Sequence, residues 1–172
     1  MRVVAGELRG RHLEAPEGLQ TRPTSDKVRQ AVFNSLDSAG FIDGATVADL
    51  FAGSGAMGVE ALSRGAKSCV FVEKDRTALA VLRRNLAALG LEEQSKVLAA
   101  DVMTALAQAG TVDLAIVDPP YEFAGWPELL AAVGAATVVA ESDREITPAE
   151  GWHTIRARRY GRTFVTILGR IT

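Results

Sequence analysis

Val112-Asp-Leu-Ala-Ile-Val-Asp-Pro-Pro-Tyr121 is the stretch of sequence that decides the fold of this chain. The apolar run from Leu114 to Val117 contains no alternating polar residues, which is typical of a strand covered on both faces of a sheet. Pro119 and Pro120 end this strand, because proline has no N–H to donate to a sheet ladder and its φ is fixed. We therefore expect a stiff loop at the carboxyl end of a central strand, where open α/β sheets bind ligands.

This loop carries groups that can recognise a planar base. Asp118 offers a carboxylate, and Pro119 offers a carbonyl that is free of the ladder. Pro120 completes the rigid corner, and Tyr121 adds an aromatic ring. Two hydrogen-bond acceptors beside a flat ring suit a base with an exocyclic amine. An ordinary turn at the end of a strand is the plainer alternative.

Strand patterns and helix patterns alternate on both sides of this stretch. The alternation predicts a Rossmann-like α/β fold, with a mostly parallel twisted sheet and right-handed crossovers. Two extended runs meet at Tyr160-Gly161 and predict a C-terminal antiparallel hairpin. The expected strands are residues 47–51, 67–73, 96–100, 112–117, 137–140, 153–159 and 162–168, and the expected helices begin near residues 25, 56, 77, 102 and 126.

The chain is expected to form a single domain over residues 1–172. Residues 2–15 predict two short strands around a turn near residues 6–10, and residues 1–20 are interpreted as a small N-terminal β-hairpin appendage. Further along the chain, Thr77 is the expected N-cap of the helix that follows the second strand.

A helix is also predicted after the appendage. Thr24 or Ser25 can cap its N-terminus. Apolar residues at helical spacing predict its packed face, and three basic residues are expected to stay polar. The apolar residues are Val28, Ala31, Val32 and Leu36, and the basic ones are Arg22, Lys27 and Arg29.

The composition excludes several classes of protein. An apolar fraction of 48% and a charged fraction of 23% are those of an ordinary globular domain. No apolar run is long enough for a membrane span, and the N-terminus lacks the apolar core of a signal peptide, so we expect a cytoplasmic protein. Cys69 is a single cysteine in an apolar strand and is interpreted as a core residue. His12 and His153 lack the spacing of zinc ligands.

Charge is distributed unevenly along the sequence. Residues 1–36 carry a net charge of +2, residues 37–150 carry −9 and residues 151–172 carry +5. An acidic body with basic ends can bind a polyanion at one edge only. A solvated arginine face on an edge hairpin is the alternative interpretation.

The segment Gly53-Ser-Gly-Ala-Met-Gly58 lies after a predicted strand and before a predicted helix. Glycines at this spacing permit a tight turn and a close approach of ligand to backbone. Glu73 follows Gly53 by twenty residues, at a strand end, where its carboxylate can accept from ribose hydroxyls. These features predict an adenosine-containing cofactor, but nicotinamide and flavin enzymes share them.

Three further acids narrow the choice of cofactor. Asp49 precedes the glycine loop, and Asp101 and Asp118 end the third and fourth strands. Together with Glu73 they would repel a pyrophosphate and attract a cation. S-adenosylmethionine carries a sulfonium and an ammonium, so it is the expected cofactor. Each acid taken alone could equally be a helix cap or a surface charge.

The motifs together resemble a known family. Asp49-Leu-Phe-Ala-Gly-Ser-Gly55, the strand-end Glu and Asp, and Asp118-Pro-Pro-Tyr121 resemble class I S-adenosylmethionine-dependent amino-methyltransferases. Arg22-Pro-Thr-Ser-Asp-Lys-Val-Arg-Gln-Ala-Val-Phe-Asn34 and the closing hairpin are similar to the RsmD family, whose members methylate N2 of a guanine in 16S ribosomal RNA. The resemblance extends from residue 2 to residue 168.

The resemblance implies roles for individual residues. Asp118, Pro119, Pro120 and Tyr121 would face the target base as the catalytic group. The implied cofactor-binding residues are Thr24, Asp49, Phe51, Ala52, Gly53, Ser54, Gly55, Glu73, Lys74, Asp101, Val102 and Asp118. No metal is implied.

The implied partner is ribosomal RNA, within a partly or fully assembled small subunit, and the chain is expected to act as a monomer. The expected basic contacts are Arg9, Arg11, Arg156, Arg158, Arg159 and Arg162. The chain departs from the family in being compact between Tyr121 and Glu141, where Phe123 and Trp126 either extend the base platform or belong to the core.

Several alternatives stay open at this point. Asp-Pro-Pro-Tyr also serves enzymes that methylate adenine N6 or cytosine N4, and a protein glutamine is another possible substrate. A nicotinamide-binding oxidoreductase module and an RNA-binding protein without activity belong to other classes. The lack of a second domain and of a placed catalytic histidine argues against the oxidoreductase.

Overall fold

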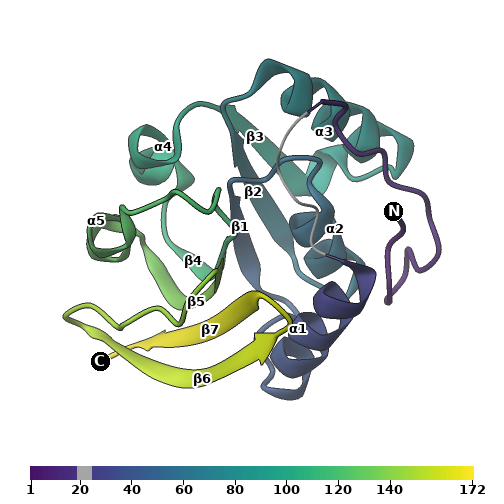
Figure 1. The fold of residues 1–172 in the computed structure, drawn as a ribbon. Helices are drawn as coiled ribbons and strands as arrows, with labels where there is room; N and C mark the ends of the chain where they lie inside the picture. Colours follow the sequence, from purple (N-terminus) through teal and green to yellow (C-terminus); the bar gives the residue numbers. More distant parts are fainter. Residues whose placement is uncertain (19–24) are drawn as a thin grey trace.

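A seven-stranded sheet with helices on both faces forms the framework of the molecule (Figure 1). The computed structural model describes residues 1–18 and 25–172. The elements are α1 (Asp26–Ser38), β1 (Thr46–Leu50), α2 (Ala56–Ser63), β2 (Ser68–Glu73), α3 (Arg76–Ala88), η1 (Glu92–Gln94), β3 (Ser95–Ala99), α4 (Val102–Ala109), β4 (Val112–Val117), α5 (Trp126–Ala132), β5 (Ala135–Ser142), β6 (Trp152–Tyr160) and β7 (Thr163–Arg170).

The strand order β3-β2-β1-β4-β5-β7-β6 confirms the predicted fold class. Strands β1 to β5 pair with one another in parallel, and β7 pairs antiparallel with both β5 and β6 at one edge. The chain proceeds from β1 outward through β2 and β3, and then returns to place β4 on the other side of β1. The order therefore reverses between β1 and β4, and a crevice at such a switch point is where open α/β sheets bind ligands.

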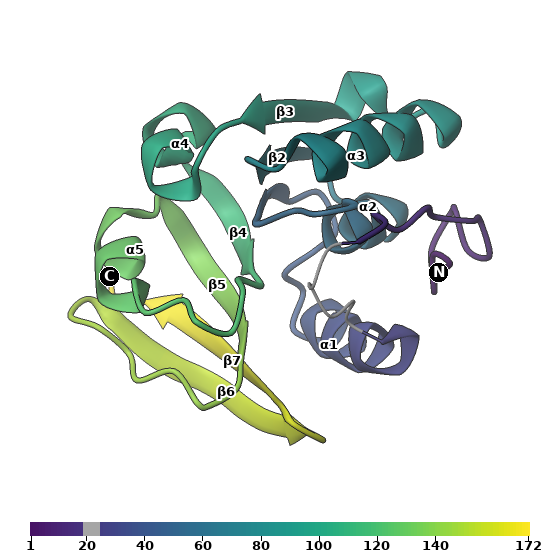
Figure 2. The ribbon, with the colours of Figure 1, turned by 45° about the horizontal axis from the view of Figure 1, so that its top comes forward.

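The hydrophobic core lies on both faces of the sheet. Helices α1, α2 and α3 cover one face, where Phe33, Val59 and Phe71 are buried. Helices α4 and α5 cover the other face, where Leu129 and Leu130 are buried (Figures 1 and 2). Burial on two sides explains the unbroken apolar run of β4. Within the described residues, no helix is both long enough and apolar enough to cross a membrane.

Helix α1 begins where its sequence offers a cap. The Ser25 hydroxyl accepts a hydrogen bond from the Val28 N–H at 3.2 Å, as predicted for one of the two candidate caps. The other candidate, Thr24, lies outside the described residues, as does Arg22. Val32 and Leu36 are buried on the face toward the sheet.

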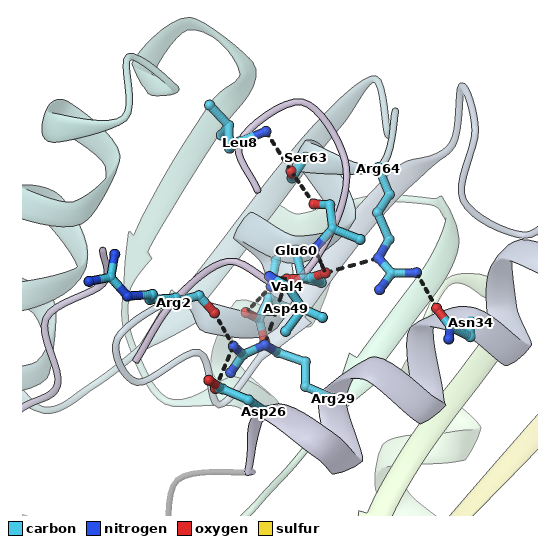
Figure 3. Close-up of polar contacts among 12 residues, drawn as sticks. Arg2, Val4, Leu8, Asp26, Arg29, Asn34, Asp49, Glu60, Ser63 and Arg64 are labelled. Carbon is cyan, nitrogen blue, oxygen red and sulfur yellow. Dashed lines mark hydrogen bonds and ion pairs between the residues drawn. The ribbon is translucent and has the colours of Figure 1, made fainter. Parts of the chain in front are cut away.

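Arg29 corrects the prediction that this side chain is part of a polar face. It is fully buried, because the helical period places it next to the packed residues of α1. Its Nη2 donates to Asp26 Oδ1 at 2.9 Å and to the Arg2 carbonyl, and its Nε lies 3.7 Å from Glu60 Oε2 (Figure 3). A buried guanidinium therefore joins α1 to α2 and to the N-terminal segment.

The N-terminal segment packs against α2 through polar contacts. The Glu60 carboxylate is fully buried and accepts from the N–H groups of Val4 and Ala5 at 2.9 and 3.0 Å. The predicted pair of strands is reduced to one isolated bridge between Arg2 and His12. Backbone groups that would extend a ladder bond instead to side chains of α2.

Helix α3 shows that the predicted cap Thr77 is wrong. The N-cap is Asp75, whose Oδ1 accepts from the Ala78 N–H at 2.9 Å. The aspartate two residues earlier takes the capping role, so the helix starts at Arg76.

Candidate active site

The chain leaves β1 through a strained residue. Phe51 has a φ of 63°, a conformation that costs a residue with a side chain about 1–3 kcal/mol and that clusters at functional sites. The Ala52 N–H then donates to the Val72 carbonyl at 2.9 Å, which turns the chain toward β2. The glycine loop therefore begins directly over the carboxyl end of the central strands.

Two glycines of this loop are needed for different reasons. Gly55 is the N-cap of α2 and has a φ of 87°, which favours glycine. A Cβ on Gly58 would lie 2.3 Å from the ring atom Cε1 of Phe71, so α2 packs against β2 at a distance that only glycine permits. The Gly58 N–H donates to Asp49 Oδ2 at 2.9 Å, which ties the first turn of α2 to β1.

The carboxyl of Asp49 lies in an electronegative environment. Burial raises its pKa well above the ordinary value, and the hydrogen bond from Gly58 opposes this shift. The charges of Asp118 and Glu73 raise the pKa of Asp49 further. Two of the other predicted acids, Asp118 and Glu73, are thus close enough to act on the Asp49 carboxyl at the switch point. A cation placed among them would relieve their mutual repulsion.

The raised pKa of Asp49 predicts a pH-dependent component of stability. An aspartate in an unfolded chain titrates near pH 3.9, so above about this pH the folded state binds more protons than the unfolded state. The free energy of unfolding therefore loses this component as pH rises from about 4 through the raised pKa. In Asp49→Asn the amide oxygen can still accept from Gly58, and we expect the variant to gain stability relative to wild type across that range.

Urea unfolding at several pH values measures this difference. Glu93→Gln removes a carboxyl at an exposed position and serves as the control. A difference between wild type and Asp49→Asn that stays constant with pH would mean that Asp49 titrates normally.

Glu73 braces the glycine loop. Its Oε2 accepts from the Gly53 N–H at 2.8 Å, and its Oε1 accepts from the N–H groups of Lys74 and Asp75 at 2.9 Å. A carboxylate has about four acceptor positions, so these bonds leave capacity for about one more donor. Among the described residues, Glu73 thus fixes the loop and keeps one acceptor position.

Asp101 has a double role beside Glu73. Its Oδ1 accepts from the Met103 N–H at 3.0 Å as the N-cap of α4, and its Oδ2 lies 3.9 Å from Lys74 Nζ. Both side chains of this ion pair are more than half exposed, so it contributes little to stability. Val102, the first residue of α4, is buried in the core.

The loop after β4 is placed at the switch point as expected. Asp118 and Pro119 are half-buried, whereas Pro120 and the Tyr121 ring are exposed. The Phe123 N–H donates to the Pro120 carbonyl at 3.0 Å and closes a tight turn. The ring of Tyr121 is therefore presented to solvent in the same loop as Asp118.

Aromatic rings connect the two loops of the site. The Phe123 ring makes edge-to-face contacts with Phe51, at 5.2 Å between ring centroids, and with Trp126, at 5.4 Å. Such pairs contribute about 0.5–1.5 kcal/mol beyond their buried area. Trp126 is buried in the first turn of α5 and is a core residue. Phe123 is half-buried between Phe51 and Trp126, a bracing role that the sequence did not indicate.

The arginines that were expected to contact RNA lie at opposite edges of the sheet. Arg159 pairs with Phe164, and Phe164 pairs with Ser142 at the carboxyl end of β5. The β6–β7 turn therefore lies at the edge of the candidate site. Arg11 Nη2 instead donates to the carbonyl of Ala88, the last residue of α3, at 2.9 Å. Helix α3 connects β2 to β3, and β3 is the strand at the other edge of the sheet.

Comparison with known proteins agrees with this architecture. The family model described as Conserved hypothetical protein 95 matches residues 1–169. YlbH of Bacillus subtilis (strain 168) is 37% identical over 181 residues, which cover 97% of each chain. Ribosomal RNA small subunit methyltransferase D of Escherichia coli (strain K12) is 43% identical over 122 residues, which cover 70% of this chain and 60% of that protein.

A solved structure of the yhhF protein from Escherichia coli is 35% identical. It superposes with a TM-score of 0.85 and covers 99% of this chain and 97% of its own. The chain therefore belongs to the Conserved hypothetical protein 95 family, which is the RsmD family that its motifs resemble.

Proposed function

We propose that this protein transfers a methyl group from S-adenosylmethionine to the N2 amine of a guanine in 16S ribosomal RNA of the small subunit. Family membership and the names of the relatives support a ribosomal RNA methyltransferase. The observation that carries the proposal is the cluster of interacting carboxylates of Asp49, Glu73 and Asp118 at the switch point.

The residues at the switch point fit S-adenosylmethionine better than a dinucleotide. A pyrophosphate would add negative charge beside acids that already repel one another, whereas a sulfonium and an ammonium would be attracted. The backbone of Gly53, Ser54 and Gly55 would hold the methionine part, and the remaining lone pair of Glu73 would accept from the ribose. Asp101 and Val102 would frame the adenine. When bound, the cofactor supplies an electrophilic methyl group.

Glu73→Gln tests this assignment without changing the shape of the side chain. The amide would place an NH₂ group against either the Gly53 N–H or the N–H groups of Lys74 and Asp75. We expect affinity for S-adenosylmethionine to fall about tenfold or more, because a lost bond to a charged group costs about 1.5–3 kcal/mol.

Isothermal titration calorimetry with S-adenosylmethionine measures the loss. Glu122→Gln removes an exposed carboxylate near the other loop and should bind the cofactor normally. Unchanged affinity of Glu73→Gln would remove Glu73 from the cofactor site.

The loop after β4 would activate the amine of the base. The lone pair of a guanine amine is delocalised into the ring, so this nitrogen is a weak nucleophile. Asp118 and the Pro119 carbonyl would accept its two N–H bonds, localise the lone pair and orient it toward the methyl group. Positive charge develops on the nitrogen, and these fixed acceptors stabilise it. The proton then leaves toward Asp118 or water.

The exposed ring of Tyr121 would stack on the base and contribute about 1–3 kcal/mol. A paired base inside a helix cannot present its amine to the Asp118 corner, so the target must be unpaired or flipped out. Positioning of both reactants by rigid loops removes part of the entropic barrier. The diproline corner and the aromatic contacts of Phe123 provide that rigidity.

Labelled methyl transfer tests the function. Small subunits from a strain that lacks the enzyme, and protein-free RNA from the same subunits, would be incubated with the protein and S-adenosylmethionine. Mass spectrometry of the nucleosides should find N2-methylguanosine. N6-methyladenosine would overturn the choice of base, and no transfer to either substrate would overturn the function.

A further inference from the structure

Strand β6 forms a free edge of the sheet and exposes almost all of its side chains. Its pairing with β7 is irregular between Thr154 and Arg156, where one extra residue, Ile155, is accommodated as a bulge. A bulge reverses the face toward which the following side chains point. Each side chain after Ile155 therefore points to the face opposite to the one it would have in a regular strand.

The bulge sorts the β6 arginines by face. Arg156 pairs with Ile167 and Arg158 with Val165, and both partners belong to the core under α1. Directly paired residues share a face, so Arg156 and Arg158 lie on the α1 side. Arg159 points to the other face, with its guanidinium 5.5 Å from the centroid of the paired ring and its Nε donating to the Gly161 carbonyl at 2.7 Å.

The arginines on the α1 side border a groove that is also lined by Ser35 of α1. Arg156 Nη1 donates to the neutral hydroxyl of Ser35 at 3.0 Å, across a groove between α1 and the β6–β7 hairpin. The groove holds only about 10 Å³, roughly one water, so a ligand would bind at its mouth. Across residues 1–18 and 25–172, neither Arg156 nor Arg158 forms an ion pair.

The acids of α1 are engaged elsewhere. Asp26 lies 2.9 Å from Arg29 and Asp37 lies 2.7 Å from Arg64, so each has its own cationic partner. The C-terminal hairpin itself contributes no acid between residues 151 and 172. A polyanion is therefore the ligand that matches the charge of this surface.

This surface is level with the base-binding loop. Val117, the residue before Asp118, pairs with Ala140 of β5. The next residue of β5, Glu141, pairs with Val165. Val165 in turn pairs with Arg158, so Arg158 is level with Asp118. Arg158 is thus about three strand spacings, roughly 14 Å, from the corner at Asp118. Figure 2 shows the β6–β7 hairpin and α1 side by side on one flank of the molecule.

We propose that Arg156 and Arg158, with Ser35, form a phosphate-binding track for the RNA strand that flanks the target base. This inference rests on the proposed function and adds the direction from which RNA approaches, along the α1 side of the hairpin. It excludes the N-terminal arginines from the interface, because Arg11 is held at the opposite edge of the sheet. The bulge in β6 is the feature that creates the track.

Arg158→Glu is the principal test, because the Arg158 side chain is exposed and forms no ion pair within the described residues. Each contact to a phosphate in single-stranded RNA contributes about 0.7 to the slope of log K against log salt concentration, so the slope should fall by about this amount. We expect KM for RNA to rise about tenfold with kcat unchanged. Arg158→Lys keeps the charge and should restore most of the slope.

Arg83→Glu is the matched control, because it makes the same change in charge on an exposed position of α3. Binding would be followed by fluorescence anisotropy of labelled 16S RNA fragments over a range of salt concentrations. Equal slopes for Arg158→Glu and Arg83→Glu would overturn the track. So would a loss with Arg9→Glu or Arg11→Glu and none with Arg158→Glu.

The same set of proteins separates this inference from the proposed function. If wild type methylates small subunits and Arg158→Glu does so with an unchanged KM, the function stands and the track is wrong. If wild type binds RNA but transfers no methyl group, the function is wrong, and the salt slopes still decide whether the track binds RNA. Loss of binding to assembled subunits alone, with normal binding to protein-free RNA, would indicate a protein partner and overturn the proposal.

Discussion

Asp118→Ala is expected to lower kcat for methyl transfer by about 10²–10³-fold or more, and to weaken affinity for S-adenosylmethionine by a much smaller factor, because Asp49 and Glu73 still attract its positive charges. The carboxylate would accept an N–H of the target amine and stabilise the positive charge that develops there. These interactions strengthen in the transition state, so their loss lowers kcat rather than raising KM. Single-turnover transfer of a labelled methyl group, with calorimetry for the cofactor, measures both quantities.

Two further variants sharpen this test. Asp118→Asn keeps one oxygen that can accept an N–H bond, and should retain more activity than alanine. Glu122→Ala removes an exposed carboxylate four residues along the same loop and should leave the rate unchanged. An Asp118→Ala enzyme with more than a tenth of the wild-type kcat would remove Asp118 from the proposed role.

Glu60→Ala is expected to lower the free energy of unfolding by about 3–5 kcal/mol, because it breaks a buried ion pair. Its carboxylate accepts hydrogen bonds from two backbone N–H groups of the N-terminal segment. It also accepts from Arg64 Nε at 2.9 Å. It also neutralises Arg29, whose Nε lies 3.7 Å away and whose guanidinium is fully buried. Alanine leaves that cation without its buried counter-charge (Figure 3).

Urea unfolding of a double variant separates charge from packing. Replacing both partners, as in Arg29→Met with Glu60→Leu, removes the buried cation together with its counter-charge, so it should cost less than Glu60→Ala alone. Glu93→Ala is an exposed control and should change stability by less than about 0.5 kcal/mol. If Glu60→Ala were as stable as Glu93→Ala, the buried cluster would not hold the N-terminal segment in place.

Local sequence patterns were sufficient for the architecture and for the positions of the loops. The unbroken apolar run of β4 and the diproline that follows it specify a buried strand and its end, whatever surrounds them. The glycines at 53, 55 and 58 specify a tight turn and a close helix contact. Such signals depend on backbone sterics and on burial along one segment, and both can be read from consecutive residues.

Residues that interact across elements could not be predicted in this way. Arg29 is polar, yet it is buried because Glu60 and the N-terminal segment, far away in sequence, complete its surroundings. Trp126 could not be assigned to core or platform until the packing of α5 was known. Asp75 displaced Thr77 as a cap because the chain leaves β2 at Glu73.

By itself, therefore, the sequence determined the parallel α/β sheet, the rigid Asp118–Tyr121 corner and the glycine loop, because each depends on the conformational limits of neighbouring residues. Only the tertiary structure decided which charges meet. It brought Asp49, Glu73 and Asp118 within electrostatic reach, and a single bulge in β6 turned Arg156 and Arg158 toward α1. Electrostatic interaction depends on distance through space, which the order of residues does not encode locally.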